Sequence, residues 1–480
     1  MMTLDQARQW LGLETTGRAQ AVQRVCTDSR QVQAGDLFVA LRGQNFDGHD
    51  YVASALAAGA VGAIVDHVPR AHFELLDRLL LVHSTDQALS ALARAWRLAI
   101  NPAVLAVTGS NGKTTVKEML TAIVSAHVAQ QGGDPALQVL ATEGNLNNTL
   151  GLPLTLLRLR PGHRWAVVEM GMNHAGEIAH MTRVALPQVA LVNNVQRAHV
   201  GLLGGVDGVA RAKAEIFEGL TPGGVAVLPA AGAQHPILLQ ATQGHDLVQF
   251  ALLSPDTQWV SHGSSNPSQG ADPVTDAGPR VWGQSLASSV TENRLRIGLP
   301  EGIRDVRLKV LGRHNQVNAL AASAVAYAAG IGLAAIAQGL ETYAGIKGRL
   351  QLNLAANGAY VLDDTYNANP DSVMAAIDVL AEHPGQRVLV LGDLGELGHA
   401  AHQLHAELGR YARQVGIEEC LTLGELSSET SRVFGSGAQH FTSRVALVQN
   451  LRERMNGRLV VLVKGSRFMQ MERVVQGLLA

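Results

Sequence analysis

The segment Thr108 to Thr115, T-G-S-N-G-K-T-T, contains the residue types of a loop that binds phosphate. Its two glycines allow a tight bend in which backbone N–H groups point at phosphate oxygens. Lys113 is placed to reach the outer phosphates, and the Thr114 hydroxyl is placed to bind Mg²⁺. The spacing departs from the common phosphate loop, since Val107 stands where that motif has its first glycine. The alternative is a glycine-rich turn with a lysine placed by chance.

A loop of this kind indicates a nucleotide but does not name a reaction. The chain has no Asn-Lys-x-Asp motif for reading guanine, so ATP is the expected nucleotide. The residues predicted to surround its phosphates are Thr108, Gly109, Ser110, Asn111, Gly112, Lys113, Thr114 and Thr115.

Three further residues are candidates for a metal and catalytic site. Glu169 ends the apolar run WAVVE, where an acidic residue typically holds Mg²⁺ opposite a phosphate loop. His199 follows the next apolar run, and Lys213 lies in a predicted helix, GVDGVARAKAEIFEGL. An unmodified lysine is not a Mg²⁺ ligand, so Lys213 has no evident role from its chemistry alone. Ordinary alternatives are a strand-end acid, a hydrogen-bonded histidine and a solvated helix charge.

Alternating elements must position these residues. Short β-branched runs, glycine-containing turns and Ala/Leu-rich amphipathic stretches repeat along the chain, which predicts an α/β fold of parallel sheets covered by helices. We expect three domains, at residues 1–100, 101–312 and 313–480. Asn101-Pro102 marks the first boundary because the residue before proline is pushed out of helical geometry. The polar stretch 254–279 is interpreted as an exposed insertion.

The composition of the 480-residue chain excludes several classes of protein. Hydrophobic residues make up 47% and charged residues 16%, so widespread disorder is excluded. A net charge of −2 provides no global field for nucleic acid or an anionic membrane. No apolar run reaches the roughly 20 residues needed to span a bilayer. The two cysteines, Cys26 and Cys420, and the lack of a signal peptide favour a cytoplasmic protein. We expect a monomer.

Taken together and in order, these motifs resemble the Mur ligase family over essentially the whole chain. The phosphate loop, Glu169, His199, the A-K-A-E-I-F segment and GRHNQVNALAA (312–322) follow the order of that family. The segments TEGNLNNTLGLP, DDTYNANPDS, LGDLGELG and VKGSR are similar to the member that joins D-alanyl-D-alanine to a UDP-linked muramoyl tripeptide. The N-terminal segment TDSRQVQAGDLFVALRGQNFDGHDY resembles the UDP-recognising domain of that member and of the member that adds the third peptide residue. The resemblance implies a small N-terminal UDP-binding domain, a central ATPase-like domain and a C-terminal Rossmann-like domain.

The resemblance also implies roles for individual residues. Lys213 would be carbamylated by CO₂, which turns a cation into a carboxylate able to bind Mg²⁺. One or two Mg²⁺ ions would be held by Thr114, Glu169, His199 and Lys213, and the catalytic residues would be Lys113, Lys213, His199 and Arg349. Arg349 would contact the γ-phosphate region, Asn315 and Asn318 the adenine, and Asp364 the ribose. The predicted substrate-binding residues are Ser29, Arg30, Asn147, Tyr366 and Asn367. Surface charges and turn-capping asparagines are the alternatives.

The reaction implied is ATP-dependent amide formation through an acyl phosphate, with a UDP-N-acetylmuramoyl tripeptide and D-alanyl-D-alanine as substrates. Three rivals are open: the family member that adds the third residue, folylpolyglutamate synthase, and a phosphate-loop ATPase that makes no bond. The first rival's Asp-Asn-Pro-Arg motif is absent. His399, His402 and His405 recur every three residues, but zinc is disfavoured because no cysteine or acidic partner accompanies them, and an exposed helix face is expected.

Overall fold

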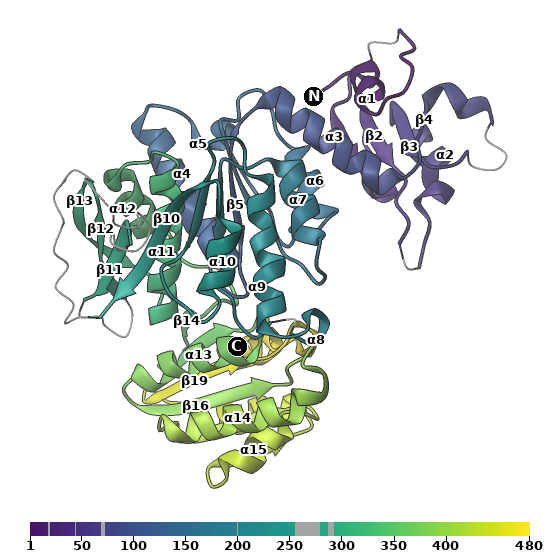
Figure 1. The fold of residues 1–480 in the computed structure, drawn as a ribbon. Coiled ribbons are helices and arrows are strands. Elements are labelled where there is room, and N and C mark those ends of the chain that lie inside the picture. Colours follow the sequence, from purple (N-terminus) through teal and green to yellow (C-terminus); the bar gives the residue numbers. More distant parts are fainter. Residues whose placement is uncertain (18–19, 44, 69–72, 199, 255–278, 287–291) are drawn as a thin grey trace. The chain divides into compact units, whose positions relative to one another are not determined.

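The computed structural model describes residues 1–17, 20–43, 45–68, 73–198, 200–254, 279–286 and 292–480 (Figure 1). His199 and nearly all of the predicted insertion at 254–279 therefore lie outside the described residues. The chain divides into two compact units. The first comprises Met1–Val107, Gln131–Ala190 and Glu215–Gly224, and the second Thr108–Gln130, Leu191–Ala214 and Val225–Ala480. The three domain boundaries expected from the sequence stay predictions.

The first unit begins with a small parallel sheet. Strands β1 (Arg24–Cys26), β2 (Asp36–Val39), β3 (Gly62–Val65) and β4 (Leu79–Leu81) lie in that order, all parallel. The helices of this part are α1 (Leu4–Trp10), α2 (Val52–Ala57) and α3 (Thr85–Ile100), with short 3-10 turns η1 (Ser29–Gln31), η2 (Gly48–Tyr51) and η3 (Phe73–Arg78). Helix α3 ends at Asn101, which adopts a left-handed conformation just before Pro102.

The strands that carry the phosphate loop belong to a nine-stranded sheet, in the order β13-β12-β11-β10-β9-β8-β5-β7-β6. Their bounds are β5 (Ala103–Thr108), β6 (Val139–Ala141), β7 (Trp165–Glu169), β8 (Val189–Val192), β9 (Val225–Pro229), β10 (Asp246–Leu253), β11 (Val281–Ser285), β12 (Asn293–Leu299) and β13 (Gly302–Leu308). The α/β fold with parallel sheets is confirmed, and the sheet ends in an antiparallel addition, because β12 is antiparallel to both β11 and β13. The tight turn at Pro300-Glu301 permits this reversal.

The helices between these strands in the sequence, and those that follow the last of them, belong to both units. They are α4 (Lys113–Gln130), α5 (Pro135–Gln138), α6 (Gly151–Leu156), α7 (Glu177–Ala185), α8 (Val200–Leu203), α9 (Val206–Ala214), η4 (Glu215–Gly219), α10 (His235–Ala241), α11 (Arg313–Ala328) and α12 (Leu333–Thr342). The sequence predicted Lys213 near the middle of a longer helix. Helix α9 ends at Ala214, so Lys213 lies in its last turn instead. Gly339 brings α12 against α4, because a β-carbon there would overlap the backbone of Ile123.

The C-terminal part contains a six-stranded sheet, in the order β14-β15-β19-β16-β17-β18 (Figure 1). The strands are β14 (Gln351–Leu354), β15 (Tyr360–Asp364), β16 (Gln386–Gly392), β17 (Glu419–Leu423), β18 (Ala438–Phe441) and β19 (Leu459–Lys464). The helices are α13 (Pro370–Glu382), α14 (Ala401–Gln414), α15 (Ser428–Phe434), α16 (Arg444–Arg452) and α17 (Glu472–Leu479), with turns η5 (Gly398–Ala400) and η6 (Arg467–Met469). All pairs in this sheet are parallel except β14 with β15.

The sheet is buried on both faces, which explains its continuous apolar runs. In β16, Val388 and Val390 belong to one hydrophobic cluster, while Leu389 and Leu391 belong to another. Because side chains alternate along a strand, these two clusters lie on opposite faces of the sheet. Polar residues that follow such strands are therefore held at the carboxyl edge of a rigid layer.

Candidate active site

The phosphate loop connects strand β5 to helix α4, as predicted. Thr108 ends the strand and is fully buried, and Lys113 begins the helix. Gly112 has φ +77, and a β-carbon there would overlap the side chain of Asn318. A glycine is therefore required at this position both by its backbone conformation and by a close neighbour.

A turn that follows β8 holds the phosphate loop in place. Ser110 N–H donates to the carbonyl of Asn194 at 3.1 Å, and Asn111 N–H donates to Asn194 Oδ1 at 2.9 Å. The Ser110 hydroxyl donates to the carbonyl of Gln196 at 3.1 Å and accepts its N–H at 2.9 Å. Asn193 Nδ2 donates to the carbonyl of Asn111 at 3.0 Å. Sequence reasoning missed these three residues, although an Asn-Asn pair directly after a buried strand was the available signal.

Asn315 and Asn318 lie behind the same loop. Asn318 Oδ1 accepts Asn193 Nδ2 at 3.0 Å, and its own Nδ2 donates to Asn315 Oδ1 at 3.1 Å. Asn315 Nδ2 in turn donates to the carbonyl of Leu311 at 2.8 Å. Both predicted residues are buried. This chain of amides lies against Gly112 and comes from the first two turns of α11.

Two lysines lie close enough to influence each other. Lys113 Nζ donates to the carbonyl of Gly109 at 2.9 Å, so its ammonium lies over the loop. Lys213 is buried, and burial followed by the positive charge of Lys113 holds the pKa of Lys213 well below its usual value. The neutral amine is therefore favoured at Lys213. A charged ammonium in this place would carry both a desolvation cost and repulsion from Lys113.

Arg349 also reaches the phosphate loop, from a distant part of the chain. Its Nη2 donates to the Thr114 hydroxyl at 2.9 Å, and its guanidinium lies 4.3 Å from the centre of the Tyr366 ring. Tyr366 N–H donates to the carbonyl of Gly348 at 3.0 Å, which ties the two segments together. Three of the predicted site residues, Thr114, Arg349 and Tyr366, are thus brought together in the second unit.

Glu169 is held rigidly at the end of β7 in the first unit. It pairs in register with Val107 of β5, is 1% exposed, and its N–H donates to Thr142 Oγ1 at 3.0 Å. Asn147 Nδ2 donates to Glu169 Oε1 at 2.7 Å. Glu169 Oε2 is buried and has no hydrogen-bond partner among the described residues. A buried carboxylate oxygen without a partner is costly unless a cation binds it. The predicted substrate residue Asn147 therefore orients a carboxylate.

Asp364 is paired with a lysine that the sequence analysis did not single out. Lys464 Nζ donates to Asp364 Oδ2 at 2.5 Å and to the carbonyl of Asn367 at 3.1 Å. Asp364 Oδ1 accepts the N–H of Leu350 at 3.1 Å. Lys464 is the lysine of the V-K-G-S-R segment and is buried at the end of β19. Asn367 itself is exposed.

The two residues expected in the UDP-sugar site lie in the first unit, in the turn after β1. Ser29 begins η1, and Arg30 forms a bidentate pair with Asp28, at 2.9 and 2.8 Å. Hydrogen bonds from Arg30 lower the pKa of Asp28 to about 2. Both residues stand at the carboxyl edge of the small parallel sheet, where ligands bind in open α/β sheets.

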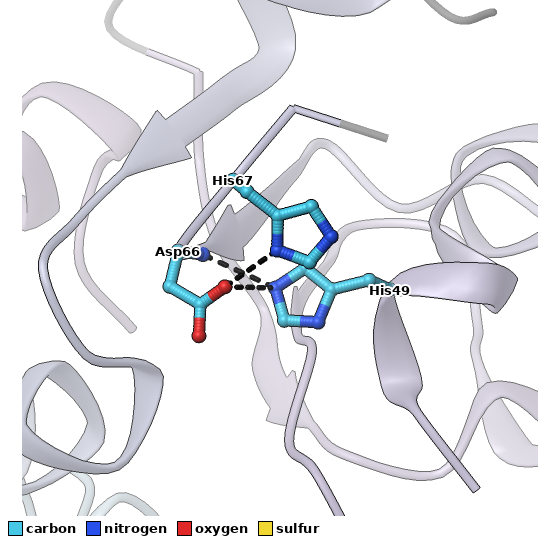
Figure 2. A group of neighbouring side chains, drawn as sticks. All are labelled: His49, Asp66 and His67. Carbon is cyan, nitrogen blue, oxygen red and sulfur yellow. Dashed lines mark hydrogen bonds and ion pairs between the residues drawn. The ribbon is translucent and has the colours of Figure 1, made fainter. Parts of the chain in front are cut away.

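A second polar cluster lies at the same edge, after β2 and β3 (Figure 2). His49, Asp66 and His67 have ligand atoms close enough together to hold a metal ion. However, His49 Nε2 accepts the N–H of Asp66 at 3.1 Å, and His49 Nδ1 lies 2.6 Å from Asp47 Oδ1. Arg42 Nη2 donates to Asp66 Oδ1 at 2.9 Å, so a cationic side chain already binds the oxygen that lies 2.6 Å from His67 Nδ1. The cluster is therefore a hydrogen-bonded network rather than a metal centre.

The histidines at 399, 402 and 405 do not share one exposed face. His399 and His402 are exposed, but His405 is fully buried, so the prediction of an exposed face is wrong for this residue. His405 Nδ1 donates to the carbonyl of Ala401 at 2.8 Å, and its Nε2 accepts Leu394 N–H at 3.1 Å. Both ring nitrogens are thus occupied by the backbone, which fixes the connection after β16.

Comparison with known families matches nearly the whole chain to three models. Residues 21–97 match the model described as "Mur ligase family, catalytic domain", residues 107–326 match the Mur ligase middle domain, and residues 348–467 match the Mur ligase glutamate ligase domain. Among the described residues, no helix is long and apolar enough to cross a membrane.

Individual proteins and structures agree with these models. The chain is 39% identical to the UDP-N-acetylmuramoyl-tripeptide–D-alanyl-D-alanine ligase of Escherichia coli over 99% of this chain and 98% of that protein. It is 32% identical to the ligase of the same name from Bacillus subtilis, with 95% and 93% covered.

Solved structures give the same picture. A crystal structure of MurF from Acinetobacter baumannii has a TM-score of 0.86 at 33% identity, covering 100% of this chain and 98% of that one. MurF from Thermotoga maritima in complex with ADP has a TM-score of 0.80 at 25% identity, covering 96% and 98%. Folylpolyglutamate synthase from Mycobacterium tuberculosis shares the fold, with a TM-score of 0.61 at 17% identity over 82% and 93%. With relatives this similar over their full length, the chain belongs to the Mur ligase family.

Proposed function

We propose that the chain is an ADP-forming ligase that joins D-alanyl-D-alanine to the free carboxylate of a UDP-N-acetylmuramoyl tripeptide, in the assembly of peptidoglycan precursors. The observation that carries this proposal is the convergence of two cationic side chains on the phosphate loop. Lys113 lies over the Gly109 carbonyl and Arg349 on the Thr114 hydroxyl. The names of the full-length relatives support the choice of substrates.

Two cations are needed because the reaction brings two anions together. A carboxylate must approach a triphosphate, and without screening their repulsion at low dielectric is several kcal/mol or more. Lys113 and Arg349 are proposed to neutralise charge on the transferring phosphoryl group. Asn193, Asn194 and Gln196 fix the position of the loop, and the start of α4 is proposed to orient the remaining phosphate oxygens.

The bond changes are balanced by the substrates alone. A carboxylate oxygen of the tripeptide attacks the γ-phosphorus, the bond to the β–γ bridging oxygen breaks, and ADP leaves. The resulting acyl phosphate has a far better leaving group than hydroxide. The amine of D-alanyl-D-alanine then attacks the acyl carbon, phosphate leaves with one carboxylate oxygen, and the amine loses a proton. Asp364 and Lys464, with Tyr366 beside Arg349, are proposed to hold the nucleotide; Ser29 and Arg30 are proposed to hold the UDP group.

Magnesium fits the donor groups that the chain provides. The proposed ligands are Thr114, Glu169, His199 and carbamylated Lys213. The unpartnered Oε2 of Glu169 supports a cation there, and the lowered pKa of Lys213 favours the neutral amine that adds CO₂. Mg²⁺ would neutralise the triphosphate and align its oxygens. We place the reaction in the cytoplasm, where ATP and UDP-linked precursors occur, and the monomer expected from the sequence stays a prediction.

A phosphate-release assay separates this function from its rivals. Purified protein is given MgATP alone, with the tripeptide nucleotide, and with both the tripeptide nucleotide and D-alanyl-D-alanine. Tripeptides ending in diaminopimelate and in lysine are both offered, and product mass is measured. Full phosphate release and a pentapeptide product are expected only with both substrates. Strong release from MgATP alone would support an ATPase, and a folate substrate accepted in place of the tripeptide would support the folylpolyglutamate reaction.

A further inference from the structure

The turn from Asn193 to Ala198 has polar contacts in two directions. Asn194 and Gln196 bind the phosphate loop, as described above. The next residue, Arg197, instead contacts two helices of the C-terminal part of the same unit, α13 and α14. A segment of six residues therefore connects the nucleotide-binding loop to the sheet that carries Asp364 and Lys464.

Arg197 makes an unusually complete set of contacts. Its Nε donates to Asp371 Oδ1 at 2.8 Å, and its backbone N–H donates to Asp371 Oδ2 at 2.7 Å. Its Nη1 lies 3.1 Å from both carboxylate oxygens of Glu407. The three side chains are 31%, 20% and 34% exposed, so the group is only partly screened by water. Hydrogen bonds between charged groups in such a setting are stronger than ordinary surface pairs.

The charges show why Arg197 cannot be removed without consequence. Asp371 lies in the first turn of α13 and Glu407 lies in α14, and both carboxylates face the same guanidinium. One positive charge is thus shared by two negative charges. Without Arg197 the two carboxylates would be left facing each other, which costs more than the loss of a single ion pair.

A second contact closes the arrangement into a ring. Asn369 caps α13 by accepting the N–H of Ser372 at 2.9 Å, and its Nδ2 donates to Asn111 Oδ1 at 2.7 Å. The start of α13 therefore binds the phosphate loop through Asn369 and the 193–198 turn through Asp371. Asn111 and Gln196 are joined by their own side-chain hydrogen bond. The start of α13 is thus held at two points, and Arg197 provides one of them.

We propose that Arg197, with Asp371 and Glu407, is a positioning group that holds the 193–198 turn, the phosphate loop and α13 in one arrangement, and thereby couples ATP cleavage to amide formation. This inference rests on the proposed ligase function. An acyl phosphate is hydrolysed when water reaches it before the amine does. Loosening the ring would lengthen the time in which water can enter, so phosphate would be released without product.

The test compares the ratio of phosphate released to pentapeptide formed in the full-length protein. We expect R197A to raise this ratio about tenfold, because a charge-assisted network of this kind shifts an equilibrium by about that factor. R197K keeps the charge but not the fork, and should give a smaller rise. D371N combined with R197A should add little beyond R197A alone, since both remove the same link.

The matched control is R387A. Arg387 forms a similar fork with Glu418, with Nε at 3.0 Å, within the C-terminal sheet and away from the phosphate loop. R387A should lower the midpoint of thermal unfolding but keep the wild-type ratio. A wild-type ratio in R197A, or an equal rise in R387A, would overturn the inference. If R197A does not fold, the ratio of phosphate to pentapeptide is measured in E407Q and R197K instead, and it should rise in both. Failure of the ligase proposal is distinguishable, because the wild-type protein would then form no pentapeptide at all.

Discussion

The guanidinium of Arg349 donates a 2.9 Å hydrogen bond to the hydroxyl of Thr114, although the two residues are 235 positions apart in the chain. Arg349 also stacks on Tyr366. Its position therefore depends on two segments at once. A planar guanidinium with several N–H donors suits this geometry better than the compact ammonium of a lysine.

Arg349→Lys should lower kcat about a hundredfold, because the charge remains but the fork and the stacking contact are lost. Steady-state kinetics with ATP varied would measure this, with circular dichroism confirming the fold. Arg432→Lys, in an exposed pair with Glu429, is the control and should stay at the wild-type rate. An unchanged kcat in Arg349→Lys would show that the Arg349 guanidinium is not needed for phosphoryl transfer.

Asn147→Ala should weaken Mg²⁺ dependence and stability together. The substitution leaves both oxygens of the buried Glu169 carboxylate without a protein partner, which costs about 1–3 kcal/mol of unfolding free energy. Titration of activity with MgCl₂ should show a higher half-saturating concentration, and urea unfolding should show the loss of stability. Asn148→Ala, at the neighbouring exposed turn, tests whether any change in this segment has the same effect. Unchanged Mg²⁺ dependence in Asn147→Ala would argue against a cation at Glu169.

Lys213→Ala should lose at least about a thousandfold in kcat, because the proposed carbamate could not form. Added short-chain carboxylates, or the Lys213→Glu substitution, should restore part of the activity by returning a carboxylate to this position. Lys309→Ala removes a lysine outside the proposed site and should behave as wild type. A fully active Lys213→Ala protein would refute the carbamate.

The stability of the protein should fall as the pH is lowered through the range of free histidine. Burial lowers the pKa of His405 from its usual 6.5, so the folded state disfavours the charged ring. The unfolded chain binds the extra proton below that value, and stability present at neutral pH is lost toward pH 5. His405→Gln should reduce this slope by up to about 1.4 kcal/mol per pH unit, measured by urea unfolding at pH 7.5 and 5.5. An unchanged slope would assign the acid sensitivity to other groups.

Much of the fold was predictable from the sequence because its strands are buried on both faces. Runs such as WAVVE and RVLVLG are continuous and apolar, which indicates buried strands. The glycines after β5 indicate the turn between this strand and the following helix. The antiparallel hairpin of β12 and β13 was missed because strand direction depends on pairing partners and not on local pattern.

The parts of the candidate site that were missed depend on contacts between distant segments. Asn193, Asn194 and Gln196 are ordinary turn residues until the phosphate loop lies beside them. His405 sits in a polar stretch, and only the neighbouring Leu394 backbone shows why it is buried. Asn147 donates a hydrogen bond to Glu169, a contact that the sequence did not indicate, and its role in substrate binding stays a prediction. Such roles follow from tertiary structure, which residue types and spacing do not encode locally.

The formation of an acyl phosphate can be tested most directly with a labelled substrate. The terminal carboxylate of the tripeptide nucleotide is enriched in ¹⁸O, the ligation is run with MgATP and D-alanyl-D-alanine, and the released phosphate is analysed by mass spectrometry. One ¹⁸O atom is expected in each phosphate, because the attacking carboxylate oxygen leaves with phosphorus when the amine adds. Lys113→Ala, with the loop cation removed, should yield no labelled phosphate. Unlabelled phosphate formed alongside the pentapeptide would contradict the mechanism.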